Sequence, residues 1–130
     1  TMRLLPLLAT FCLLGCTGDE TVAGYGAADR VWVLEELDGT PFAARATLLF
    51  PETGKIAGEA PCNRYSGVMT APYPWFGATQ VVSTKMACPE LEAETKFLGA
   101  LTAMTLSEVL GDVMILSNDT GREMVFTAAE

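Results

Sequence analysis

Apolar and polar residues form short alternating runs along most of the chain, and this pattern predicts a mainly β protein. From residue 30 onward, apolar runs of about five residues are separated by turn residues. Short strands at such spacing are typical of β-sandwiches and barrels. We therefore expect strands over the ranges 31–36, 46–50, 56–59, 65–70, 80–85, 106–110, 113–117 and 123–127.

Turn residues between these runs support the strand boundaries. Asp38-Gly39 closes the first run, Glu52 to Lys55 favours a hairpin turn, and Asn118 to Gly121 joins the last two runs. In the final run Met124 and Phe126 share one face, which is the alternation of a half-buried strand. Pro72 and Pro74 indicate an edge strand or a loop before the run at 80–85.

One segment departs from the β pattern and predicts a helix. Its apolar residues recur at near-helical spacing: Leu91, Phe97, Leu98, Leu101 and Met104. Pro89 suits the first helical position, and Glu92 with Lys96 makes a supportive i to i+4 pair. The expected fold is therefore α+β, an antiparallel sheet curled into a small barrel-like domain with one helix packed on it.

The acids at the start of this helix have two interpretations. Glu90, Glu92 and Glu94 could act as paired acids in hydrolysis. Acids are also the residues that any helix N-terminus favours, because they complement its positive dipole end. We prefer the second interpretation.

The first 15 residues have the pattern of an export signal. Met2 and Arg3 precede an apolar stretch from Leu4 to Leu14, which is interrupted only by Thr10 and ends at Gly15. The stretch is too short to span a bilayer, which needs about 20 apolar residues. A buried core helix is the alternative, but Pro6 and the Gly-rich break after Leu14 disfavour it.

The end of the signal carries a candidate lipidation site. Leu13-Leu14-Gly15-Cys16 resembles the lipobox of bacterial lipoproteins, which implies that residues 1–15 are removed and that Cys16 is acylated. Thr17 after the cysteine is similar to the outer-membrane sorting choice, so we expect an anchored domain that faces the periplasm. An ordinary secreted protein with a chance cysteine is the alternative. Residues 16–29 are expected to be the lipidated cysteine and a flexible tether, because few of them are large and apolar.

Charge and the absence of histidine narrow the function. The chain has 16 Asp and Glu against 8 Lys and Arg, or 7 once Arg3 is removed with the signal. This balance disfavours nucleic acid as a partner. With no histidine, Ser-His-Asp and Cys-His catalysis and His-ligated zinc are excluded. An enzyme would have to use carboxylates, Lys85 or a thiol, so we expect no enzyme, no metal and no cofactor.

Two cysteines remain for the folded domain, Cys62 and Cys88. In an oxidising compartment a disulfide between them is the economical interpretation. Free structural thiols are one alternative. A reactive Cys88 at a helix start, where thiol pKa values fall, is another.

Taken together, the motifs resemble the META domain of HslJ-type bacterial lipoproteins, over residues 30–128. The matching segments are Trp32–Leu34 with Asp38-Gly39, Gly58 with Pro61–Gly67, Ser83–Cys88, Glu94–Leu101, Val113–Leu116 and Gly121–Phe126. Pro61 departs from the pattern, since the family more often has glycine there. The resemblance implies the barrel-like fold, no established catalytic residue, and loose links to envelope stress, novobiocin tolerance and lipid-binding pilotins.

Two short segments are candidate recognition sites. Asn63, Arg64 and Tyr65 could form an interface anchor. The structural alternative, which we prefer, is that Asn63 adopts a left-handed turn while Arg64 and Tyr65 brace the loop. Trp75 with its neighbour Phe76 is either an exposed apolar contact or loop packing.

The leading functional hypothesis is a monomeric, non-catalytic envelope lipoprotein that supports stress resistance through binding. A second hypothesis is a pilotin-like carrier of a lipid or apolar peptide, or an inhibitor of an envelope-directed enzyme. An apolar groove under the helix would favour the carrier, and a rigid protruding loop around Asn63 or Trp75 would favour the inhibitor. The third is an enzyme that uses Cys88 or carboxylates.

Overall fold

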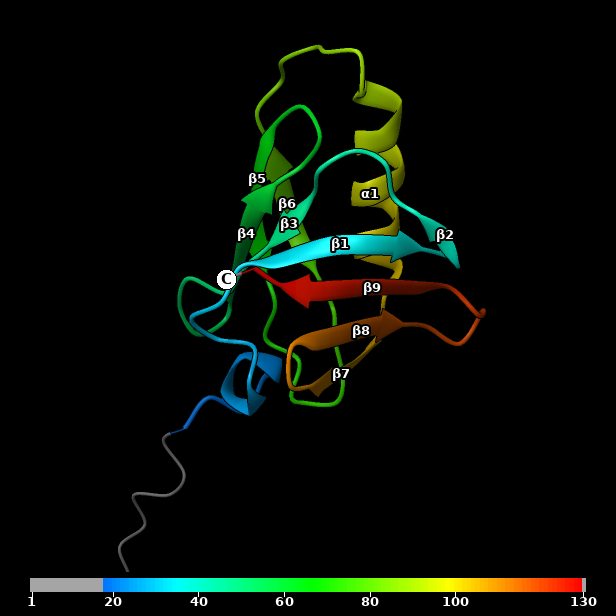
Figure 1. Cartoon of the computed structure of the whole chain (residues 1–130). Coiled ribbons are helices and arrows are strands. Elements are labelled where there is room, and N and C mark those ends of the chain that lie inside the picture. The colour runs from blue at the N-terminus through cyan, green and yellow to red at the C-terminus, as the bar shows by residue number, and fades with distance from the viewer. Residues whose placement is uncertain (1–17, 130) are drawn as a thin grey trace, which may run out of the picture.

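The computed structural model describes residues 18–129 and contains two antiparallel sheets and one α-helix (Figure 1). The expected signal peptide, Cys16 and Thr17 lie outside the described residues. The mainly β class with one packed α-helix is therefore confirmed, with the strands divided between two sheets.

The larger sheet joins the beginning and the end of the domain. Its order is β2-β1-β9-β8-β7, and β3 pairs with the start of β1. Its strands are β1 (Trp32–Leu37), β2 (Thr40–Pro41), β3 (Thr47–Leu48), β7 (Leu106–Leu110), β8 (Val113–Ser117) and β9 (Glu123–Ala128). The pairing of β1 with β9 ties residues about 90 positions apart in the chain, a long-range closure of the kind that slows folding.

The smaller sheet has the order β4-β5-β6, formed by β4 (Lys55–Glu59), β5 (Arg64–Val68) and β6 (Thr79–Ser83). An isolated bridge between Leu49 and Ala57 connects β4 to the chain that leaves β3. The predicted turn at Glu52 to Lys55 lies between these two segments, and the amide of Lys55 donates to the carbonyl of Glu52 at 3.0 Å.

Helix α1 (Leu91–Ala103) lies behind the larger sheet in Figure 1. It begins later than expected, because a turn in which the Leu91 amide donates to the Cys88 carbonyl precedes it. Pro89 therefore lies before the N-cap, Glu90, and its prediction as the first helical residue was wrong. Glu92 and Lys96 do approach to 3.9 Å, but both are exposed and contribute little.

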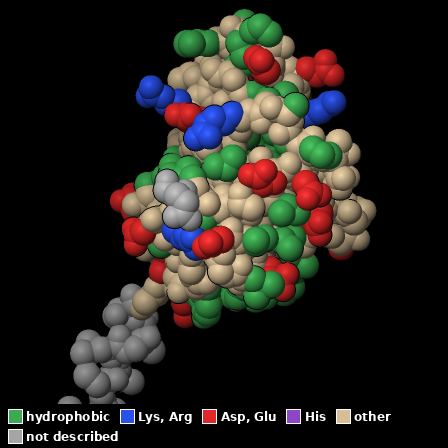
Figure 2. Space-filling view, in the orientation of Figure 1, with side chains coloured by type: hydrophobic (Ala, Val, Ile, Leu, Met, Phe, Trp, Pro, Cys, Tyr) green, Lys and Arg blue, Asp and Glu red, His purple; other side chains and the backbone are tan. Residues whose placement is uncertain are grey.

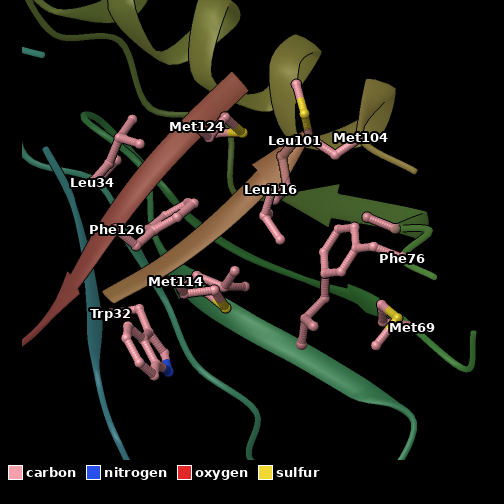
Figure 3. Packing of buried hydrophobic residues seen from close by; sticks show 14 of the residues in the cluster. Trp32, Leu34, Met69, Phe76, Leu101, Met104, Met114, Leu116, Met124 and Phe126 are labelled. Carbon is pink, nitrogen blue, oxygen red and sulfur yellow. The ribbon is translucent and has the colours of Figure 1, made fainter. Parts of the chain in front are cut away.

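The core lies between the larger sheet, α1 and the smaller sheet, which contributes Ile56 and Tyr65. The predicted alternation in β9 is confirmed, since Met124 and Phe126 are fully buried, and Met114 and Leu116 of β8 match them across the ladder. Figure 3 shows these side chains with Trp32 of β1. Burial of such side chains is the main favourable contribution to folding.

The segment before β1 packs against the core from Thr21 onward, so the prediction that the tether remains flexible as far as Asp29 was wrong there. Val22 and Ala27 are fully buried. The carbonyl of Ala27 accepts a 2.9 Å hydrogen bond from the indole N–H of Trp32. This hydrogen bond ties the segment to a fully buried ring of β1.

A short 3₁₀ helix, η2 (Val22–Tyr25), organises this segment. Its N-cap Thr21 accepts a hydrogen bond from the Ala23 amide. Tyr25 stacks on Tyr73 with ring centroids 4.6 Å apart. The folded body therefore includes residues that the sequence pattern assigned to the tether.

Gly58 occupies a position in β4 where a side chain does not fit. A Cβ there would lie 2.2 Å from the Thr47 carbonyl oxygen and 2.8 Å from the Tyr65 hydroxyl. That hydroxyl donates to the same carbonyl at 2.6 Å. The absence of a side chain at Gly58 is what lets β4 approach β3 this closely.

We therefore expect Gly58→Ala to lower the free energy of unfolding by about 1–3 kcal/mol, the usual cost of overpacking. Urea denaturation followed by circular dichroism would measure it. Gly99→Ala is the control, because Gly99 lies on the exposed face of α1 with nothing within 4 Å of the added Cβ. That variant should gain up to about 1 kcal/mol from helix propensity. Equal effects from the two variants would contradict the packing argument.

Candidate functional site

The disulfide that the sequence favours is present between Cys62 and Cys88, whose Cα atoms are 5.7 Å apart. It joins the loop before β5 to the turn before α1. With both sulfurs bonded to each other, Cys88 offers no free thiolate, so its interpretation as a reactive nucleophile is not supported.

Glu94, in the first turn of α1, lies directly beneath this loop. Its side chain is only 5% exposed. One carboxylate oxygen, Oε1, accepts hydrogen bonds from the backbone amides of Cys62 (2.9 Å) and Asn63 (2.7 Å). The other, Oε2, accepts one from the side-chain amide of Asn63 at 2.7 Å. Glu94 is therefore neither a solvent-facing helix-terminal acid nor an accessible catalytic one.

The sequence contains a signal for this role that helix-dipole reasoning misses. Glu94 precedes Phe97 by three positions and Leu101 by seven, so the three share one face of the helix. Both of these apolar residues are fully buried. A carboxylate on a buried face is costly unless donors surround it, so its position predicts a polar partner.

Asn63 connects Glu94 to the segment after β6. Besides its bond to Glu94, its Nδ2 donates to the Met86 carbonyl at 2.9 Å, and its Oδ1 accepts from the Thr84 hydroxyl and the Met86 amide. All the usual hydrogen-bonding capacity of the amide is thus used. Asn63 does not have the positive φ expected for it, so it shapes the loop through its side chain.

The ionisation of Glu94 follows from these contacts. Burial raises the pKa of its carboxyl, but the hydrogen bonds from Asn63 and Cys62 and the nearby charge of Lys85 outweigh burial. The net result is a pKa below the usual value, so Glu94 is ionised at neutral pH. Both oxygens of this buried carboxylate already accept hydrogen bonds from the protein, so Glu94 is poorly placed for proton transfer to a substrate.

The other candidate recognition residues divide between core and surface. Tyr65 is buried, with its ring edge-on to Phe97, and burial raises the pKa of its hydroxyl. Arg64 is exposed. Trp75 is 57% exposed whereas Phe76 is buried, so one member of that pair faces solvent and the other packs in the core.

A cleft of about 790 Å³ lies between the β1–β2 hairpin with its following loop and the first half of α1. Phe42 and Ala93 are among its apolar lining residues, and the Phe42 ring lies 6.4 Å from that of Phe97. Its size is in the range of small-molecule sites. Sequence reasoning missed the cleft because its walls come from residues 37–44 and 89–96, which only the tertiary fold brings together.

Charged side chains of both signs line the cleft. Asp38 Oδ2 accepts a 3.0 Å hydrogen bond from Arg122, and Oδ1 accepts one from the Glu123 amide. Both bonds hold the pKa of Asp38 below its usual value. Glu90 and Lys96 lie on the helix side. The cleft therefore offers apolar contact together with hydrogen-bond donors and acceptors.

Within residues 18–129, no group of three or more Cys, Asp or Glu side chains is placed to hold a metal ion. No described helix is both long and apolar enough to cross a membrane. The buried polar side-chain atoms of the same residues all have hydrogen-bond partners, so no orphaned group marks a further polar site.

Solved structures share this fold. A protein from Burkholderia xenovorans, determined by NMR, is 25% identical with a TM-score of 0.65, over 99% of this chain and 94% of that one. A DUF4847 family protein from Bacteroides vulgatus has a TM-score of 0.63 at 13% identity, over 82% of this chain and 96% of that one, which shows the fold alone. The curated proteins contain no match.

The sequence profile of the META domain matches residues 26–130, which is most of the chain. The match begins before the predicted boundary at residue 30 and takes in Ala27, whose carbonyl holds the indole of Trp32. The resemblance read from the motifs is confirmed: this chain belongs to the META domain family.

Proposed function

We propose that the protein is a non-catalytic, lipid-anchored protein of the bacterial envelope whose META domain binds a short apolar peptide segment. The cleft beside α1 is the observation that carries this proposal. Membership of the META family supports an envelope-associated, non-enzymatic role. The lipid anchor rests on Leu13–Cys16, and the disulfide fits an oxidising compartment such as the periplasm.

The lining of the cleft favours a peptide over an acyl chain. Phe42 and Ala93 supply apolar contact. Lys96 and Arg122 can donate hydrogen bonds, and Glu90 can accept them. Backbone groups of a peptide can use such partners, whereas the methylene groups of an acyl chain cannot.

The same geometry favours the carrier hypothesis over the inhibitor hypothesis. The cleft lies alongside α1 and not under it, but apolar residues form part of its lining, so it can hold an apolar segment as a carrier would. The loop at Asn63 is held down by Glu94 and does not protrude as an inhibitory loop would. Trp75 remains exposed, but it lies at the edge of β7 and not beside the cleft.

The test is a titration of a soluble form that begins at Thr17, which retains every core residue between Val22 and Phe126. Eight-residue peptides with a central Leu-Phe-Leu sequence, and laurate in parallel, would be added while backbone amide shifts are followed by NMR. We expect peptide-induced shifts in residues 37–44 and 89–96. Shifts with laurate but not with the peptides would mean that the cleft binds an acyl chain. If neither ligand shifts the amides of the two segments, the cleft is not a binding site.

Ala93→Trp provides the sharper variant, since a large ring would fill the cleft. We expect it to weaken peptide binding at least about tenfold, equivalent to about 1.4 kcal/mol. Thr95→Trp adds the same ring on an exposed part of α1 that does not line the cleft. Equal affinity for the two variants would place the peptide elsewhere.

A further inference from the structure

The outward face of the larger sheet is apolar in its centre and has no cover from the described residues. In Figure 1 no helix or strand lies in front of β1, β9 and β8. The ladder registers place residues side by side on this face, because directly paired residues in antiparallel strands point the same way. Outward apolar side chains of the sheet are Val33, Leu106, Leu110, Val113, Ile115 and Val125.

Two large apolar side chains on this face are strongly exposed. Leu110 at the end of β7 is 68% exposed, and Trp75 is 57% exposed. A bridge between Trp75 and Leu106 adds the tryptophan to the β7 edge, on the side to which Leu106 points. Contiguous exposed apolar surface of this kind is typical of protein interaction sites.

Carboxylates flank the apolar centre on both sides. The register places Val125 opposite Glu36 and Ile115 opposite Glu108, so one row across the sheet reads acid, apolar, apolar, acid. In Figure 2 hydrophobic and acidic side chains lie next to one another over β1, β9 and β8.

A β-bulge in β1 places a second carboxylate on the outward face of the sheet. The register shifts between Leu34 and Glu36. Glu35 accepts a 2.9 Å hydrogen bond from the hydroxyl of Thr127, which points outward, so Glu35 and Glu36 both lie on this face. Bulges place two consecutive residues against one partner, and here they double the charge at one edge.

Basic residues are missing from the same surface. The outward ladder positions include Glu35, Glu36, Glu108 and Glu123, but no Lys or Arg. At the margin, Arg30 is engaged by Asp112 and by the Gly111 carbonyl. The face is therefore complementary to a partner that is apolar and positively charged.

We propose that this face docks a basic amphipathic helix of a partner protein. Its apolar side chains would lie over Ile115 and Val125, and its Lys or Arg side chains would pair with Glu36 and Glu108. A second copy of this chain would bring acids against acids, and an anionic lipid surface would repel the same carboxylates, so neither is favoured. The face shares no lining residue with the cleft, and this proposal stands independently of the one made for the cleft.

The experiment is a titration of the soluble form beginning at Thr17 with a synthetic 18-residue amphipathic helix that has leucine on one face and lysine on both flanks. Binding would be measured by calorimetry and located by amide shifts. We expect shifts in β8, β9 and β7 and an affinity that falls with added salt. A peptide with glutamate in place of lysine should not bind.

Paired charge reversals separate a local effect from net charge. Glu36→Lys with Glu108→Lys should weaken binding about tenfold, because two ion pairs become repulsive. Neither glutamate makes an ion pair within residues 18–129 that the change would break. Glu52→Lys with Glu59→Lys changes net charge equally, in the turn before β4 and at the end of β4, and should have an effect below about twofold. Leu110→Gln should also weaken binding, by removing apolar contact.

Three outcomes would overturn the proposal. Equal weakening by the two double variants would reduce the interaction to non-specific charge. Shifts confined to the cleft would place the helix there. Self-association of the unbound domain through β8 and β9, seen by sedimentation, would make a second copy the occupant of this face.

Discussion

Glu94→Gln is expected to lower the free energy of unfolding by about 2–3 kcal/mol, the cost of unbalancing a buried, charged hydrogen-bond group. Glutamine has one acceptor oxygen where Glu94 has two, so its amide would face the Asn63 amide that now donates to Oε2. Rotating the Asn63 side chain to relieve this would instead break its bonds with Met86 and Thr84. The network therefore has no neutral alternative arrangement.

The same residue predicts how stability depends on pH. The pKa of Glu94 in the folded state lies below the ordinary value of 4.5. The folded state therefore stabilises the ionised carboxylate relative to the unfolded chain. The contribution of ionised Glu94 to the free energy of unfolding is complete above about pH 4.5. It is lost as the pH falls through the pKa of Glu94 in the folded state. Urea midpoints between pH 3 and pH 7 should fall less on acidification in Glu94→Gln than in the unmodified protein.

Glu92→Gln is the matched control for this comparison. Glu92 lies two residues away on α1, and its side chain is 88% exposed. Its replacement should change the unfolding free energy by less than about 0.5 kcal/mol, as surface substitutions usually do. If Glu94→Gln also lowered the free energy of unfolding by less than about 0.5 kcal/mol, the role assigned to the hydrogen bonds of Glu94 would be contradicted.

Removing the disulfide is the second change with a large expected effect. Cys62 and Cys88 are 26 positions apart, and cross-linking a loop of that length is worth about 3–4 kcal/mol in the chain-entropy model. The variant with Cys62→Ala and Cys88→Ala should therefore unfold at much lower urea concentration. Reduction of the unmodified protein should give a similar shift.

The folded state itself should survive this change. Glu94 continues to hold the amides of Cys62 and Asn63 without the cross-link, so amide shifts should move only near the two substituted positions. Widespread shifts in β8 and β9 would mean that the disulfide shapes the folded state. A stability loss below about 1 kcal/mol would mean that the unfolded chain gains little freedom without it.

Local patterns were sufficient for most of the fold. Alternation predicted the buried Met124 and Phe126, and helical spacing predicted α1 within two residues at its start. The turn at Asn118 formed as expected, with its Oδ1 accepting from the Thr120 and Arg122 amides. These features depend on interactions between residues close together in the chain. Periodicity and turn residues report such interactions directly.

Features that depend on distant partners were harder to predict. Ala27 looks like a tether residue until Trp32 is placed against it, and Val22 until η2 is placed against β7. The cleft needs the β1–β2 hairpin to lie across α1, and no local pattern gives that arrangement. Glu94 was predictable in principle, because it lies on the buried face of its helix, although its partner Asn63 is 31 positions away.

Because Val22 is buried in the folded domain, the distance between the domain and the membrane is limited if Cys16 is acylated as proposed. Only five residue steps separate Cys16 from Thr21, where η2 is capped. Even fully extended, that length of chain reaches about 17 Å. The domain would therefore be confined to a thin layer next to the bilayer, and any partner would have to present its binding segment close to the membrane.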